Sequence, residues 1–212
     1  MKGSMFYSWL PACVCGAVIG CSALTSRAAD PGPYVNFDAG VNLVSDVETV
    51  FFIPGLGVGI GDVAFDPGFR FGVEGGYRLS DGLGLGLETG FIFNEVESIG
   101  GSAIRDVSLM HVPILANLVF RFENSSPVVP FLGIGGGATF SIFDVDTDSD
   151  TDIVPAWQGL AGLQIKLSDT MSAGLTGKYL GVSSPEFDVG GVFVEPDTIH
   201  NYSILASLNW SF

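Results

Sequence analysis

Residues 200–212 read HNYSILASLNWSF, and apolar and polar residues alternate in this stretch. From position 202 onward every second residue is apolar, namely Tyr202, Ile204, Ala206, Leu208, Trp210 and Phe212. The residues between them are small and polar, except for Leu205. Because side chains alternate across a β-strand, the two sets fall on opposite faces. The pattern therefore predicts a strand with one apolar face, whose last residue is aromatic.

The composition indicates which solvent that apolar face meets. Hydrophobic residues make up 47% of the chain and charged residues only 15%, with 30 glycines among 212 residues. Soluble domains carry about 25% charged residues. Yet after residue 30 no apolar run reaches the ~18 residues that a membrane helix needs. A closed β-barrel is the other way to satisfy backbone polar groups in lipid, so the composition favours a barrel.

Seven further segments alternate in the same way, at residues 34–44, 69–79, 83–94, 107–122, 129–143, 155–167 and 171–181. Short turns join some of them, and they alternate with long polar connections at residues 45–66, 95–106, 144–154 and 182–198. Short turns at one end and long loops at the other are typical of outer-membrane barrels. The predicted fold is all-β, an eight-stranded antiparallel up-and-down transmembrane β-barrel.

The first part of the chain has the features of a targeting segment. Residues 1–29 combine a basic residue near the start, an apolar run and small residues at the end, which predicts a signal peptide cleaved near Ala28 or Ala29. The sequence VIGC, ending at Cys21, supports an alternative in which Cys21 is lipidated and retained. Either route exports the chain, and residues 30–212 form the predicted barrel domain.

The acidic residues are concentrated in the predicted long connections. The chain has 23 acidic against 8 basic residues and a net charge of −15. This excess argues against nucleic acid as a partner. The acidic residues in the connections are Asp46, Glu48, Asp62, Asp66, Glu95, Glu97, Asp106, Asp144, Asp146, Asp148, Asp150, Asp152, Glu186, Asp188, Glu195 and Asp197. We expect these loops to form an acidic outer surface.

A smaller set of charges falls on the polar face of the predicted strands. These interior candidates are Asp38, Arg70, Glu74, Glu88, Lys166 and Lys178. An eight-stranded barrel is just wide enough for its own side chains to fill it. Because an unpaired buried charge is costly, we expect opposite charges to pair inside the barrel. The sequence thus predicts a plugged interior.

Alternating aspartates in one connection raise the question of a cation site. The candidates are Asp144, Asp146, Asp148, Asp150 and Asp152. Carboxylates are calcium ligands, but Ser149 and Pro155 stand where an EF-hand loop needs Gly and Glu. A solvated loop is the favoured interpretation, with no metal and no cofactor. Weak divalent-ion binding that bridges lipopolysaccharide phosphates is the alternative.

Two histidines raise the question of catalysis. His111 falls on the inward face of its predicted strand, and His200 lies at the outer end of the last strand. Ser203 is three residues from His200, on the opposite face, so this pair cannot meet. A lipid-modifying enzyme would need a histidine at the outer edge beside a nucleophile. We therefore predict no catalytic residues.

Several segments resemble a known family. HVPILANL at 111–118, PFLG at 130–133, WQGLAG at 157–162 and the terminal Phe212 resemble the small eight-stranded outer-membrane barrels of the OmpA/OmpX-like group. The resemblance implies a Gram-negative outer membrane, contacts with its lipid and lipopolysaccharide, and a monomer. It also implies that Trp210 and Phe212 act as a sorting signal for the barrel-assembly machinery.

These observations lead to a functional expectation. The favoured interpretation is a non-catalytic barrel with a structural or surface-interaction role through mobile acidic extracellular loops. The alternative is a narrow, cation-preferring channel for small solutes, and a lipid-modifying enzyme is less favoured. A soluble lipocalin-like barrel would place its apolar face inside, where so many large side chains exceed the room available.

Overall fold

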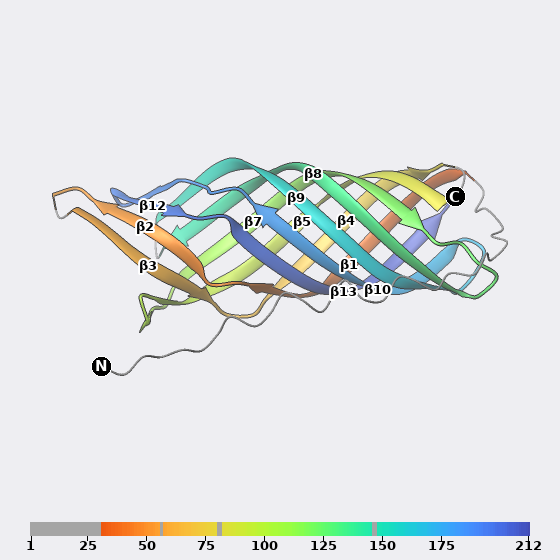
Figure 1. Ribbon diagram of the computed structural model, residues 1–212, viewed down its shortest axis with the longest axis horizontal. Coiled ribbons are helices and arrows are strands. Elements are labelled where there is room, and N and C mark those ends of the chain that lie inside the picture. Colours follow the sequence, from red (N-terminus) through yellow and green to blue (C-terminus); the bar gives the residue numbers. More distant parts are fainter. Residues whose placement is uncertain (1–30, 56, 80–81, 146–147) are drawn as a thin grey trace, which may run out of the picture.

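The computed structural model describes residues 31–212 apart from 56, 80–81 and 146–147 (Figure 1). The predicted signal peptide, residues 1–29, lies outside this part. The strands are β1 Gly32–Val44, β2 Val47–Ile53, β3 Gly57–Phe65, β4 Gly68–Arg78, β5 Leu83–Ile99, β6 Ser102–Ala103, β7 Val107–Arg121, β8 Val128–Val145, β9 Asp148–Lys166, β10 Met171–Val182, β11 Phe187–Val189, β12 Val192–Pro196 and β13 Ile199–Ser211. Within the described residues no helix is long and apolar enough to cross a membrane.

Eight of these strands form a closed antiparallel ring. The order of neighbours is β5, β4, β1, β13, β10, β9, β8, β7, and β7 pairs again with β5. The C-terminal stretch 200–212 closes the barrel, since β13 pairs with β1 from Tyr34 opposite Ser211 to Val44 opposite Asn201. The predicted eight-stranded up-and-down barrel is confirmed, and closure leaves its eight strands without a free edge.

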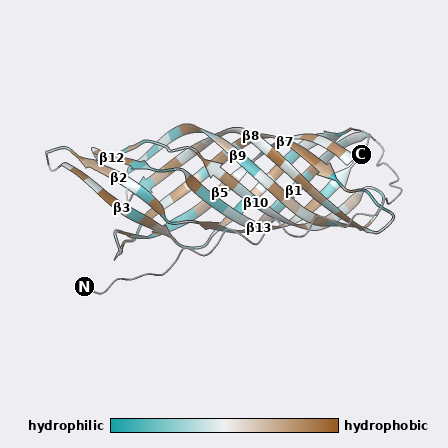
Figure 2. Ribbon diagram, in the orientation of Figure 1, coloured by the Kyte–Doolittle hydropathy of each residue, from teal (hydrophilic) through white to brown (hydrophobic). Residues whose placement is uncertain are grey.

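The apolar face of each strand points away from the barrel axis. Leu87 and Ile204 are 68% and 65% exposed, whereas Leu205, the exception in the alternation of β13, is 0% exposed and points inward. Figure 2 shows the resulting alternation of hydrophobic and hydrophilic residues along the strands. This arrangement is the inverse of a soluble barrel and suits a surrounding of lipid.

Outward aromatic side chains gather toward both ends of the barrel wall. At the end where β13 finishes, Phe37 meets Trp210 edge-on, with ring centroids 6.1 Å apart. Toward the other end, Phe69 lies 5.4 Å from Phe93, and Tyr179 lies 5.5 Å from Tyr202. Belts of this kind mark the two membrane–water interfaces of outer-membrane barrels.

The long connections are mostly strands, which corrects the prediction of mobile loops. β2 and β3 form one hairpin and β11 and β12 another, and β2 pairs with β12 while β3 pairs with β5. We call these four strands the outer extension, which projects beyond the barrel wall at the end opposite the C-terminus (Figure 1). The predicted loop 144–154 is also largely strand, because β8 and β9 stay paired as far as Val145 and Asp148. Cross-strand pairing orders these polar segments, and single-strand patterns do not show it.

Candidate functional site

The middle of the barrel is filled by a network of charged and amide side chains centred on Glu88. One carboxylate oxygen of Glu88 lies 3.0 Å from the Arg70 guanidinium and 2.7 Å from the Lys178 ammonium. Its other oxygen accepts hydrogen bonds from Gln158 at 2.7 Å and Asn117 at 2.8 Å. Five strands contribute these groups, so the network ties together opposite sides of the barrel wall.

Two further carboxylates extend this charge network. Lys178 also donates to Asp38, at 2.9 Å. Glu74 accepts a hydrogen bond from the Tyr34 hydroxyl at 2.6 Å and another from the Asn117 amide. Buried charges are tolerated when ion pairs and hydrogen bonds replace their lost hydration. The network therefore closes the lumen with groups that largely satisfy one another.

The predicted interior charges divide into two groups. Asp38, Arg70, Glu74, Glu88 and Lys178 are all buried in the barrel. Lys166 is the exception.

The prediction that Lys166 is enclosed in the barrel interior is wrong. Its side chain is 47% exposed and its ammonium lies 2.9 Å from Glu123 in the turn between β7 and β8. Lys166 has the inward parity, but it is the last residue of β9, where the wall ends and water is accessible.

Glycines facing inward make room for the charge network. A Cβ atom added at Gly72 would lie 2.6 Å from Oδ1 of Asp38, and one at Gly86 would lie 2.7 Å from Oε1 of Glu74. Both distances are shorter than van der Waals contact. The alternation of glycine with apolar residues in these strands therefore reflects a crowded interior.

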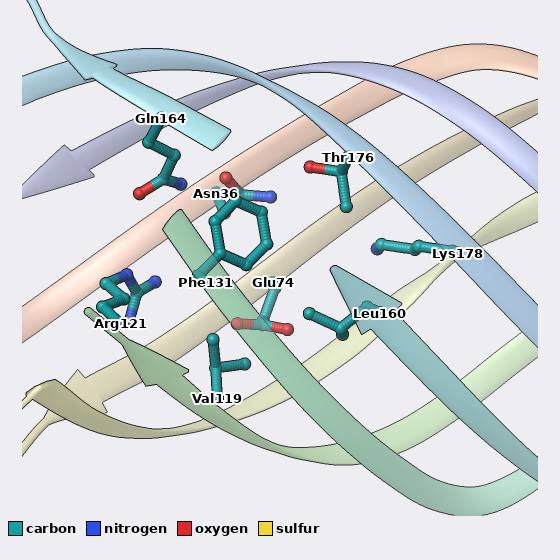
Figure 3. Close-up of a pocket in the computed structure, with 9 residues that line it drawn as sticks. All are labelled: Asn36, Glu74, Val119, Arg121, Phe131, Leu160, Gln164, Thr176 and Lys178. Atoms are coloured by element: carbon teal, nitrogen blue, oxygen red, sulfur yellow. The ribbon is translucent and has the colours of Figure 1, made fainter. Parts of the chain in front are cut away.

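A small cavity of about 20 Å³ lies beside the charge network (Figure 3). It is on the side of the network nearer the end of the barrel where β13 finishes. Its lining includes Glu74, Arg121, Gln164 and Lys178. A cavity of this size holds about one water molecule. Arg121 also stacks over the Tyr34 ring, 4.9 Å from its centroid. The cavity thus leaves room for little more than one water molecule within a packed interior.

Between the charge network and the outer extension, an asparagine cluster spans the barrel. The Asn42 amide donates to Asn94 at 2.8 Å and to Asn201 at 2.9 Å, and its own oxygen accepts from Ser203 at 2.7 Å. The Asn94 amide in turn donates to the Asp66 carbonyl at 2.9 Å. These bonds couple β1, β5 and β13 at the level where the outer extension begins.

The outermost part of the lumen is apolar. Leu109, Phe143, Val154, Val182 and Ile199 of the barrel wall pack with residues of the outer extension, which are Val47, Val63, Phe187, Val189 and Val194. Phe187 of β11 stacks on Phe143 with centroids 5.4 Å apart. The cavity left here is about 20 Å³, against ~300 Å³ or more for a small-molecule pocket. The extension thus caps the barrel with a dry core.

The alternating aspartates of β9 hold β11 in place. The Asp148, Asp150 and Asp152 carboxylates accept hydrogen bonds from three backbone N–H groups of the segment that contains β11, which are those of Gly190 at 2.9 Å, Asp188 at 2.7 Å and Glu186 at 3.0 Å. We call these three residues of β9 the aspartate ladder. Their side chains take the place of the carbonyl oxygens of a neighbouring strand.

Three of the five candidate cation ligands are therefore engaged in hydrogen bonds to the backbone. Among the described residues no group of three or more His, Cys, Asp or Glu side chains could hold a metal ion. Asp144 lies on β8, opposite Ser149, and Asp146 lies outside the described residues. The sequence showed the alternation of the aspartates but not their partner, because β11 lies more than thirty residues away along the chain.

Removing the ladder is expected to loosen β11. In the triple variant Asp148→Ala, Asp150→Ala, Asp152→Ala, three N–H groups lose their acceptors. A net hydrogen bond contributes about 1 kcal/mol, so exchange at Glu186, Asp188 and Gly190 should become roughly fivefold faster or more. Hydrogen exchange of the refolded protein measures this. Asp144→Ala, which removes a neighbouring carboxylate, should leave these rates unchanged, and unchanged rates in the triple variant would contradict the role of the ladder.

The two histidines occupy different surroundings. Nδ1 of His111 lies 3.0 Å from Oγ of Ser141, and both residues are buried in the lumen, 1% and 0% exposed. Nδ1 of His200 lies 2.9 Å from the Tyr179 hydroxyl, with the rings stacked at 5.9 Å. His111 and Ser141 are thus enclosed in the lumen, whereas the half-buried His200 pairs with a tyrosine hydroxyl on the outward face of the barrel wall.

The residues of the predicted sorting signal lie at the end of the closing strand. The backbone N–H of Phe212 donates to the Pro33 carbonyl at 3.0 Å, and the Phe212 side chain is 77% exposed. Trp210 belongs to the aromatic belt described above.

The fold, the outward apolar faces and the aromatic belts define an integral outer-membrane β-barrel. The sequence matches the family of the outer membrane protein beta-barrel domain over residues 13–212, and the chain belongs to this family. Its location is thus the outer membrane.

Solved structures show the same fold. Neisserial surface protein A is similar with a TM-score of 0.56 and 18% identity, over 87% of this chain and 99% of that one. Outer membrane protein AlkL, solved in lipid bilayers, is similar with a TM-score of 0.52 and 15% identity, over 98% of this chain and 97% of that one. No curated protein matches the sequence.

Proposed function

We propose that this protein is a non-conducting, non-catalytic outer-membrane barrel that presents an ordered acidic surface for interaction outside the cell. The observation that carries the proposal is the filled lumen. Glu88, Arg70 and Lys178 pair in its middle, and Phe187 and its apolar neighbours cap its outer part. A continuous water path through the barrel would require displacement of both the charge network and the apolar cap.

The outer extension supports the surface role. Its strands continue the sheet of the barrel through β5, and the aspartate ladder and the apolar cap hold it on the wall. Presenting a surface on a rigid scaffold lowers the ordering cost of binding. Contacts with outer-membrane lipid and lipopolysaccharide, assembly through the C-terminal strand and a monomeric state belong to the same proposal.

Conductance of the refolded chain in a planar bilayer tests the proposal. A heat-shifted band on a gel first establishes that the barrel is folded, and co-flotation with lipid vesicles establishes that it is inserted. We expect no unitary current steps in monovalent salt, because the charge network and the apolar cap block the path of hydrated ions. Stable cation-selective steps from folded, inserted protein would overturn the non-conducting assignment and restore the narrow channel.

A further inference from the structure

The outward face of the outer extension carries a cluster of exposed apolar side chains. We call it the apolar patch, and it comprises the exposed Phe52 of β2, Val58 and Ile60 of β3 and Phe193 of β12, with the half-buried Val50 of β2 beside them. Cross-strand pairs join it, with Val50 opposite Ile60 and Phe52 opposite both Val58 and Phe193. The Phe52 and Phe193 rings lie 6.0 Å apart. Val58 and Ile60 are 67% and 69% exposed, as open as the lipid-facing side chains of the barrel.

Carboxylates separate this patch from the lipid-facing belt. On β5 the outward apolar series ends at Phe93, and the next outward residues are the exposed Glu95 and Glu97. In the extension, the paired residues Glu48 and Asp62 lie between the barrel wall and the patch. Because charged side chains are costly within the hydrocarbon layer, these acids place the membrane boundary below the patch. The apolar patch therefore faces the medium.

The charge around the patch is of one sign. Glu195 lies opposite Val50 and Asp188 lies opposite Phe193, while Glu48 and Asp62 border the side nearest the barrel. Among the described residues, Arg105 is the one basic residue in the connections at this end of the barrel. An exposed apolar cluster with a charged border is typical of an interaction surface.

We propose that the apolar patch and its acidic border dock a cationic amphipathic peptide segment of a partner. The apolar side of such a segment covers Phe52, Phe193 and their neighbours, and its lysines or arginines pair with Glu195, Asp188, Glu48 and Asp62. Charge complementarity selects this occupant. A second copy of the chain would set one acidic border against another, and anionic lipopolysaccharide would meet the same repulsion at this border. The assignment rests on the proposed surface-interaction function.

Peptide binding to the refolded full chain in zwitterionic lipid nanodiscs tests the proposal. The probe is a fluorescent amphipathic helix of leucine and lysine, compared with a peptide in which glutamate replaces every lysine. Empty nanodiscs supply the background. We expect saturable binding of the lysine peptide, weakened at least tenfold in the glutamate peptide and reduced by added salt. Equal binding of the two peptides, or binding equal to the background, would overturn the proposal.

Variants locate the binding to the patch. Phe52→Ser with Phe193→Ser should weaken binding at least tenfold, and Glu195→Gln with Asp188→Asn should weaken it several-fold and flatten its salt dependence. Ile153→Ser, at an exposed apolar residue of β9 outside the patch (60% exposed), and Asp169→Asn, in the turn at the other end, are matched controls that should bind as the wild type does. The heat-shifted band reports folding for each variant.

Two outcomes would contradict the location or the occupant. If the Phe52 and Phe193 variant binds as tightly as the wild type, the patch is not the docking surface. If the same substitutions abolish a dimer seen by sedimentation and leave peptide binding unchanged, the occupant is a second copy. The conductance experiment does not depend on these results, so loss of the docking proposal would leave the non-conducting assignment standing.

Discussion

Replacing Glu88 with alanine is expected to lower the free energy of unfolding by about 3–5 kcal/mol, the largest single effect that we predict. Glu88 neutralises Arg70 and Lys178 at once and accepts hydrogen bonds from Gln158 and Asn117. Without it Lys178 keeps Asp38, but Arg70 keeps only the Gln158 oxygen at 3.0 Å. A buried cation without a counter-charge is the source of the cost.

Equilibrium unfolding by denaturant in lipid vesicles measures this difference. Asp169→Ala, at an exposed acid in the turn between β9 and β10, is the control and should stay within about 0.5 kcal/mol of wild type. The double variant Glu88→Leu with Arg70→Met removes one charge of each sign and should recover much of the loss, since the Lys178–Asp38 pair remains. A Glu88→Ala variant as stable as the control would show that the network is not a structural unit.

The substitution Leu87→Arg is expected to have the second largest effect on the free energy of unfolding. Leu87 is 68% exposed on the outward apolar face of β5, between Leu85 and the aromatic residues Phe91 and Phe93. Because this surface meets hydrocarbon, the charge should cost about 2–4 kcal/mol near the middle of the bilayer. The reason is loss of hydration and not loss of packing, since the side chain has few protein neighbours to lose.

Val58→Arg supplies the matched control for this substitution. Val58 is 67% exposed, almost the same as Leu87, but it lies in the apolar patch of the outer extension. We expect a change within about 0.5 kcal/mol, because arginine there stays in water. Denaturant unfolding in vesicles compares the two. An equal loss in both variants would place the extension in the membrane, and no loss in either would mean that the outward face of β5 does not meet lipid.

The period-two alternation and the composition together were enough to predict the barrel and the direction of its apolar faces. Alternation as in residues 200–212 also suits a soluble sheet, so the low content of charged residues and the lack of an apolar run long enough for a membrane helix after residue 30 decided between the two. Inward parity also identified Glu88 and Arg70, because few charges interrupt the small polar faces. It misplaced Lys166, since parity does not tell where a strand leaves the enclosed lumen.

The outer extension was not predicted, although part of its signal was present. The segment VETVFFI of β2 is rich in the β-branched and aromatic residues that favour strands, but the flanking glycines and acids are typical of loops. It pairs with its neighbour β3 over its whole length and also with β12, which is well over a hundred residues away along the chain. The function of the aspartate ladder depends on β11.

By itself, then, the sequence determined the solvent of each strand face, the number of barrel strands and the small size of the lumen, because these follow from local periodicity and composition. The tertiary structure decided which charges pair, how Phe187 and its neighbours cap the barrel, and that Phe52 and Phe193 meet on one outer face. Each of these depends on contacts between residues distant in the chain, and one sequence read alone carries no record of such contacts.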